Sequence, residues 1–105
     1  MGIDRTALQS SVITMLKTIF DPEIPVDIYE LGLVYGIDID DQYDVKITMT
    51  LTSPSCPVAE TLPPEVEQKV ASVEGVNSCK VEITWDPPWD KSMMSQEAML
   101  ELGFL

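Results

Sequence analysis

Apolar residues near the start of the chain recur three or four positions apart, as they do on one face of a helix. They stand at positions 8, 12, 15, 16 and 19, which predicts a helix over residues 6–19. Thr6 and Gln9 have the spacing of a capping box at its start. The helix should end before Asp21, because a proline follows that residue and disfavours the helical conformation for it.

Three later segments alternate apolar and polar residues, which is the period of a half-buried β-strand. They span residues 33–40, 43–52 and 78–85, and the polar stretch 40–42 predicts a hairpin turn. The positions expected to face the core are Leu33, Tyr35, Ile37, Ile39, Val45, Ile47, Met49, Leu51, Cys79, Val81, Ile83 and Trp85. The polar residues between them, including Thr50, should face solvent. Because every strand has one polar, solvent-facing side, we expect the helices to cover only one side of the sheet.

A second helical stripe lies between the second and third strands, and its apolar residues are Val58, Leu62, Val66, Val70 and Val73. Pro63 and Pro64 fall inside the stripe and should kink or split the helix, whereas Gly75 should end it. Ser95 is the expected N-cap of a short last helix that runs through Leu102. The order α-β-β-α-β-α over residues 1–105 predicts a single α+β domain, a two-layer sandwich with a three-stranded mixed sheet.

The length and charge of the chain exclude several classes of protein. Its 105 residues suit one domain, and 18 acidic against 6 basic residues give a net charge of −12. A nucleic-acid interface needs a basic surface, and an anionic membrane repels an acidic one, so we expect neither as a partner. No apolar run approaches the roughly 20 residues that span a bilayer, and the start of the chain does not read as a secretory signal. We therefore expect a cytoplasmic protein.

The chain contains no histidine, which removes the commonest general base and the usual partner of a nucleophilic cysteine or serine. We therefore expect no enzymatic turnover. Cys56 is the main candidate for chemistry, because it lies where the second strand ends and the second helix opens. Backbone N–H groups and the helix dipole favour a thiolate there, the form that binds metal or attacks electrophiles. Pro54 and Pro57 should stiffen this loop; the alternative is that Cys56 is a small apolar residue filling the corner.

Three further groups of residues each allow a structural and a functional interpretation. Cys79 is in register with the inward-facing residues of the third strand, so we expect it to pack in the core. The acidic residues of the loop after the first helix could support Cys56 or simply cap turns; they are Asp21, Glu23 and Asp27. The apolar tail could form a partner surface, for which the candidates are Trp89, Met93 and Met94, or it could fold back to cover the sheet or the ends of the helices.

Four motifs together resemble a known family. They read DPEIP at 21–25, DIYELGLVY at 27–35, TLTSPSCP at 50–57 and VEITWDPPW at 81–89. The first two are similar to the opening signature of the SufT/PaaD family, which includes the eukaryotic MMS-nineteen-interacting-protein factors, and the third looks like its cysteine loop. The resemblance covers about residues 8–102, and it is closest to stand-alone bacterial SufT-like proteins.

The resemblance implies a fold shared with the C-terminal domain of NifU-type scaffolds and a role in iron–sulfur cluster assembly. It implies that Cys56 assists transfer of a cluster or iron to apo-proteins, and that Asp21, Glu23 and Asp27 belong to the family's acidic loop. The implied partners are iron–sulfur assembly proteins and their apo-protein clients. Cluster iron is usually held by four thiolates, so one Cys56 suggests transient ligation, or a homodimer that pairs two of them. The alternative is an adaptor that recruits clients without binding metal.

Overall fold

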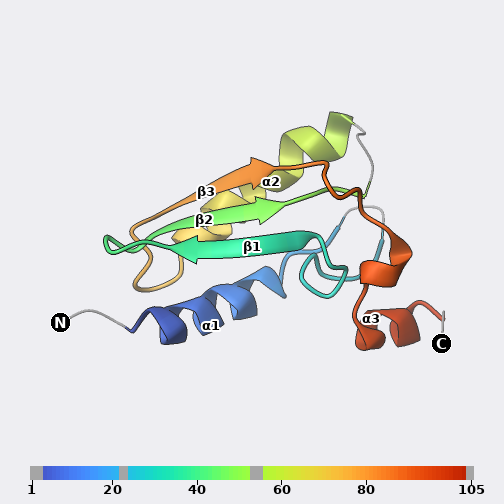
Figure 1. The fold of residues 1–105 in the computed structure, drawn as a ribbon, viewed down its shortest axis with the longest axis horizontal. Coiled ribbons are helices and arrows are strands. Elements are labelled where there is room, and N and C mark those ends of the chain that lie inside the picture. Colours follow the sequence, from blue (N-terminus) through green and yellow to red (C-terminus); the bar gives the residue numbers. More distant parts are fainter. Residues whose placement is uncertain (1–3, 22–23, 53–55, 104–105) are drawn as a thin grey trace.

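The computed structural model of the chain describes residues 4–21, 24–52 and 56–103, with the backbone alone described at residues 56–59. Its helices and strands follow the predicted order, with a short 3-10 helix added before the last helix (Figure 1). The elements are α1 (Arg5–Leu16), β1 (Val34–Ile39), β2 (Asp44–Met49), α2 (Cys56–Ala71), β3 (Ser78–Ile83), η1 (Lys91–Met93) and α3 (Gln96–Glu101). None of the helices in these ranges has the length and apolar character needed to cross a membrane.

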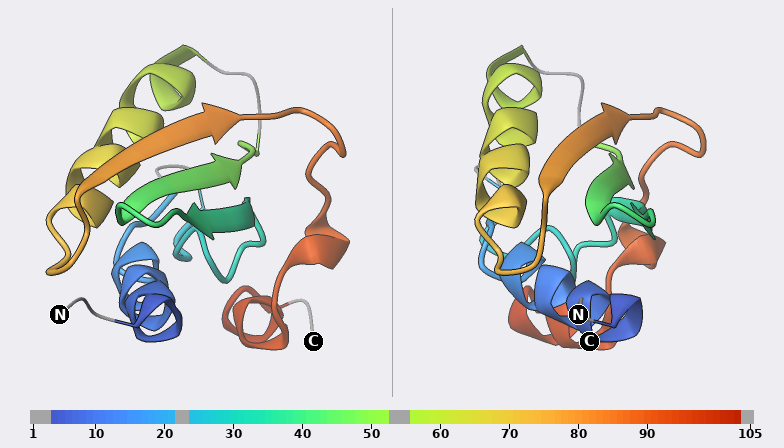
Figure 2. Two further views of the ribbon diagram at one scale, coloured as in Figure 1. Left: turned by 60° about the vertical axis from the view of Figure 1, so that its left-hand side comes forward. Right: turned by 90° about the vertical axis from the view of Figure 1, so that its left-hand side faces the viewer.

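The three strands form one sheet in the order β1-β2-β3. β1 and β2 are antiparallel and joined by a hairpin, whereas β2 and β3 are parallel because α2 carries the chain back between them. The helix α2 lies along one face of the sheet (Figure 2), and α1 packs against α2 and β1. The expected α+β architecture, with a three-stranded mixed sheet and helices, is confirmed.

Side chains from both long helices and from β2 meet in the core. The buried residues of the helices include Val12, Leu16, Leu62, Val66 and Val70. All four positions of the second strand that were predicted to face inward are buried, namely Val45, Ile47, Met49 and Leu51. Burying a side chain of this size contributes about 1.5–3 kcal/mol relative to leaving it exposed. β2 is therefore the central and most buried strand, and its carboxyl end is the point from which the chain continues toward Cys56.

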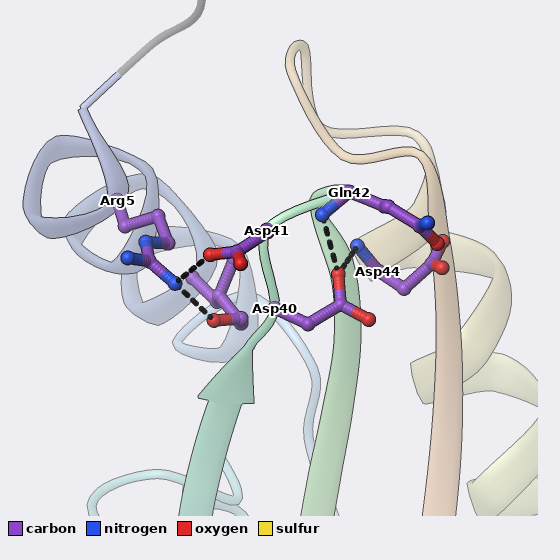
Figure 3. Close-up of polar contacts among 6 residues, drawn as sticks. Arg5, Asp40, Asp41, Gln42 and Asp44 are labelled. Carbon is purple, nitrogen blue, oxygen red and sulfur yellow. Dashed lines mark hydrogen bonds and ion pairs between the residues drawn. The ribbon is translucent and has the colours of Figure 1, made fainter.

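Two carboxylates of the predicted hairpin turn make polar contacts that stabilise it. Asp40 Oδ1 accepts hydrogen bonds from the backbone N–H groups of Gln42 and Asp44, both 2.9 Å long (Figure 3). Asp41 forms a 2.9 Å ion pair with Arg5 at the start of α1. The turn therefore also ties the first helix to the hairpin.

The alternation predicted for the first strand is wrong at one residue. A register shift between Val34 and Gly36 inserts a β-bulge into β1, and an extra residue turns the side chains near it away from their expected face. Tyr35 consequently does not pack in the core; its hydroxyl donates a 2.7 Å hydrogen bond to the carbonyl oxygen of Pro87. The bulge thus links β1 to the segment that follows β3.

Two residues beyond the strand ends also depart from the predicted alternation. Trp85 was expected to face the core, but β3 ends at Ile83 and the indole side chain is 48% exposed. Thr50 was expected to face solvent, but β2 ends at Met49 and Thr50 is fully buried. Alternation follows from the regular pleat of a strand, so it no longer decides the orientation of side chains beyond the last residue of the strand.

Some of the predicted helix caps and breaks are confirmed and others are wrong. Asp4 rather than Thr6 is the N-cap of α1, so the predicted capping box is wrong. Pro63 and Pro64 lie inside α2, which nevertheless continues as one helix, so the predicted split is not seen. The predicted cap of α3 is confirmed, because the Ser95 hydroxyl accepts a 3.1 Å hydrogen bond from the backbone N–H of Ala98.

Candidate functional site

Cys56 is the first residue of α2, the 16-residue helix that follows the central strand. The chain reaches it from the carboxyl end of β2, as the sequence predicted. The first N–H groups of a helix lack partners within the helix, and the helix dipole is positive at this end. The start of a helix therefore favours negative charge in general. The side chains of Cys56, Pro54 and Pro57 lie outside the described residues, so the expected stiffening by the two prolines stays a prediction.

The acidic loop and the strand that leads to Cys56 are joined by a chain of backbone hydrogen bonds. The N–H of Thr50 donates to the carbonyl oxygen of Leu33 at 2.8 Å, and the N–H of Leu33 donates to Ile28 at 3.1 Å. The N–H of Ile28 donates in turn to Ile19 at 2.8 Å, which lies just before the acidic loop. Motifs about 30 residues apart in the sequence thus meet at one end of the sheet (Figure 1).

The carboxylates of the acidic loop bind the backbone of their own loop. Asp21 is 4% exposed, and its Oδ1 accepts a 3.1 Å hydrogen bond from the N–H of Ile24. Asp27 Oδ2 accepts a 2.9 Å hydrogen bond from the N–H of Glu30, and burial raises the pKa of this carboxyl. Glu23 lies outside the described residues. These contacts match the capping interpretation, and a supporting role toward Cys56 stays a prediction.

Thr50 is a residue of this region whose burial the sequence pattern did not predict. Its hydroxyl is buried and has no hydrogen-bond partner within the described part of the chain. Leaving a hydroxyl buried in this way costs roughly 1–3 kcal/mol, which a fold tolerates at few positions. Its place at the head of the TLTSPSCP motif was the available signal, but strand alternation pointed the side chain outward.

Cys79 differs from Cys56 in its surroundings. Its side chain is half-buried and packs against the core, as predicted. Burial, together with the nearby charge of Glu67, raises the pKa of the Cys79 thiol to about 11. Forming the thiolate, the form that binds metal, is therefore harder for Cys79 than for an ordinary thiol.

No group of three or more Cys, Asp or Glu side chains within residues 4–21, 24–52 and 60–103 is arranged to hold a metal ion. A hollow of about 410 Å³ does lie on the open face of the sheet, but it is far from Cys56 along β2. Asp40, Asp44 and Ser78 place it at the hairpin end, whereas Cys56 follows the opposite end of that strand. The hollow is thus separate from the candidate site.

The tail folds back onto the loop that precedes β1. Trp89 Nε1 donates a 2.7 Å hydrogen bond to the carbonyl oxygen of Leu31, and the N–H of Ser95 donates to Glu30 at 2.8 Å. Met94 is only 7% exposed and belongs to the core. This arrangement agrees with the fold-back interpretation of the tail.

Gly32 shows how closely the tail approaches this loop. Its φ is +83°, and a Cβ atom at this position would collide with the backbone of Met93. Glycine is therefore required here both for its backbone conformation and for the space it leaves. Of the tail candidates for a partner surface, Trp89 and Met93 are half-buried and retain some exposure.

Known proteins match this chain over most of its length. Residues 9–83 match the family model described as iron–sulfur cluster assembly protein. The solved structure of a domain of unknown function from Bacillus anthracis is similar, with a TM-score of 0.86 and 40% sequence identity. The similarity covers 95% of this chain and 95% of that one.

Two curated relatives carry descriptive names. The chain is 50% identical over 97 residues to the Fe-S protein maturation auxiliary factor of Porphyromonas gingivalis, with 92% of each protein covered. It is 40% identical over 85 residues to the Fe-S protein maturation auxiliary factor SufT of Staphylococcus aureus, with 81% of this chain and 97% of SufT covered. The chain therefore belongs to the iron–sulfur cluster assembly protein family, and its resemblance to SufT-like proteins is confirmed.

Proposed function

We propose that this protein is an accessory factor of iron–sulfur cluster maturation, which assists transfer of a cluster or iron to apo-proteins through Cys56. The observation that carries the proposal is the position of Cys56 as the first residue of α2, in a chain whose relatives are named Fe-S protein maturation auxiliary factors. Residues 1–105 act as one domain, in the cytoplasm, and perform no enzymatic turnover. The cluster or iron is cargo that the protein holds briefly.

Cys56 and Cys79 have different roles because their surroundings differ. Cluster iron binds thiolates, and the start of a helix favours a thiolate. Burial raises the pKa of Cys79 to about 11 and so makes its thiolate less accessible than that of an ordinary thiol, which leaves Cys56 as the ligand. One ligand per chain cannot close a site that usually needs four, and the others come from an assembly protein, a client, a small thiol or Cys56 of a second copy.

The acidic loop and the tail form the surface that partner proteins recognise. Asp21 and Asp27 shape the loop at the same end of the sheet as the start of α2, and Glu23 completes the acidic motif. Trp89 holds the tail against this loop through Leu31. The partners are iron–sulfur assembly proteins and apo-protein clients that contact this end of the molecule.

A second candidate function is that of an adaptor which recruits clients without touching metal. The exposed side chain of Trp85 favours it, because this large apolar residue follows β3 at the end of the sheet from which Cys56 is reached. Aromatic residues are enriched in protein interfaces. An adaptor needs the surface but not the thiol, and this difference separates the two functions.

Anaerobic titration with ferrous iron and sulfide, followed by visible absorption, tests the metal-binding function. The wild type should develop thiolate-to-iron charge-transfer bands that Cys56→Ser loses. Cys79→Ser is the matched control and should keep the bands, because that thiol is protonated and half-buried. Equal spectra for the wild type and Cys56→Ser would leave only the adaptor.

Complementation of a deletion strain supplies the test in cells. Cys56→Ser should fail to restore the activity of iron–sulfur enzymes, whereas Cys79→Ser should restore it. Full rescue by Cys56→Ser would exclude transfer through this cysteine. An anaerobic pull-down that recovers assembly proteins and cluster-bearing enzymes with both variants would then identify the adaptor.

A further inference from the structure

The outer edge of β3 presents backbone groups that the sheet itself does not use. β3 is an edge strand, and the N–H of Thr84 just beyond it donates to Met49 at 2.9 Å. In a parallel pair, alternate residues direct both their N–H and C=O groups toward the neighbouring strand. The N–H and C=O groups of Cys79, Val81 and Ile83 therefore point away from β2. An edge of this kind is a ready template for another strand.

Glu67 of α2 occupies the middle of this edge. Its Oε2 accepts a 2.9 Å hydrogen bond from the backbone N–H of Val81. Glu67 is half-buried, and its position on α2 brings a charged acceptor from the helical layer around to the strand edge. A strand that added to β3 would have to displace this carboxylate from Val81 first.

The edge is complementary to itself. When two copies of β3 pair antiparallel about Val81, Lys80 of each copy lies opposite Glu82 of the other. Both side chains are exposed on the open face of the sheet, so two opposite-charge pairs form across the contact. On the other face, Cys79 lies opposite Ile83 of the second copy. Both are only half-buried in the monomer, so this pairing would cover apolar surface that the monomer leaves partly exposed.

We propose that the outer edge of β3 is a pairing surface for β3 of a second copy, and that Glu67 holds it closed. Pairing about Val81 joins the two sheets into one continuous sheet. At its centre, the N–H of Val81 in each copy, which Glu67 accepts from in the monomer, donates to the carbonyl oxygen of Val81 in the other copy. The proposal goes beyond cluster maturation and does not depend on Cys56. Two chains of net charge −12 repel each other, so pairing should strengthen as salt screens that repulsion.

Sedimentation velocity of the full chain over a series of protein concentrations, at moderate and high salt, tests the proposal. Glu67→Ala should raise the weight-average mass by up to twofold over the wild type at high concentration. Glu67→Gln should behave as the wild type, because its amide oxygen still accepts from Val81. Glu65→Ala is the matched control, since Glu65 lies on the same helix and pairs only with Lys69 among the ion pairs seen. An unchanged mass for Glu67→Ala, or an equal rise for Glu65→Ala, would overturn the proposal.

A charge exchange tests the register of the pair. In the Glu67→Ala background, Lys80→Glu places like charges across the contact and should abolish the rise in mass. Adding Glu82→Lys restores opposite charges and should recover it, even though that change also breaks the 3.2 Å ion pair between Lys46 and Glu82. If Lys80→Glu leaves the dimer intact, pairing about Val81 is wrong. Circular dichroism verifies folding, and Glu67→Lys, which also removes the acceptor, replaces Glu67→Ala if that variant does not fold.

Discussion

The indole Nε1 of Trp89 donates a 2.7 Å hydrogen bond to the carbonyl oxygen of Leu31, although the two residues are 58 positions apart. This bond fastens the tail to the loop between the acidic motif and β1. Leu31 is fully buried, so its carbonyl oxygen has little access to water as a substitute partner. The contact therefore supports the end of the sheet at which Cys56 lies.

Replacing Trp89 by Phe should remove this bond while keeping an aromatic ring. We expect the free energy of unfolding to fall by about 1–3 kcal/mol, because the Leu31 acceptor is left buried and unsatisfied. Urea unfolding followed by circular dichroism measures it. The control is Trp85→Phe, whose exposed side chain should change stability by no more than about 0.5 kcal/mol. Equal losses in both variants would show that the hydrogen bond contributes nothing.

Replacing Thr50 by Val exchanges a buried, unpartnered hydroxyl for a methyl group of similar size. We expect the protein to become more stable by about 1 kcal/mol, because burying an unpaired hydroxyl is unfavourable. Thr48→Val, a change to a half-buried residue of β2, is the control and should alter stability by less than about 0.5 kcal/mol. Denaturant unfolding of both variants measures this. A less stable Thr50→Val would mean that the hydroxyl has a partner after all.

The thiol of Cys79 should react slowly with iodoacetamide until the solution is strongly alkaline. In a Cys56→Ser background, the alkylation rate should rise about tenfold per pH unit toward pH 11, because the thiolate reacts and the pKa of Cys79 is raised to about 11. Glu67→Gln removes a negative charge that contributes to this pKa, so its profile should move to lower pH. A profile centred near pH 9 in the Cys56→Ser protein would contradict the burial of the Cys79 thiol.

The same thiol links stability to pH. The folded state holds the Cys79 proton more tightly than the unfolded state, in which the thiol has its ordinary pKa of 9.0. Its contribution to the free energy of unfolding is therefore complete below pH 9 and is lost as the pH rises toward 11. Cys79→Ala should flatten this decline in denaturant unfolding measured across the alkaline range. A decline of the same steepness in the variant would assign it to other groups.

Asp27 should give a pH dependence on the acidic side. Burial raises the pKa of Asp27, so the folded state binds this proton more tightly and the ionised form opposes folding at neutral pH. Asp27→Asn should be at least as stable as the wild type at neutral pH, because the amide oxygen can still accept from Glu30. The difference should shrink as the pH falls through the pKa of the wild-type carboxyl. A difference that grows on acidification would show that the carboxylate stabilises the fold.

The sequence by itself determined the order of the elements and the position of the candidate cysteine. Helical spacing and strand alternation report which side of a segment is apolar, and this property is local. The hairpin turn, the Ser95 cap and the opening of a helix at Cys56 likewise depend on residues that are neighbours in the chain. These features could therefore be predicted without knowledge of the rest of the fold.

Only the tertiary structure decided what covers each surface. Thr50 is buried and Trp85 is exposed because both lie beyond the last residue of their strand, and Tyr35 leaves the core because β1 contains a bulge. The raised pKa of Cys79 and the closure of the β3 edge both involve Glu67, a residue of a different element. Periodicity identifies an apolar face but carries no information on which distant segment packs against it, and burial, pairing and pKa depend on that segment.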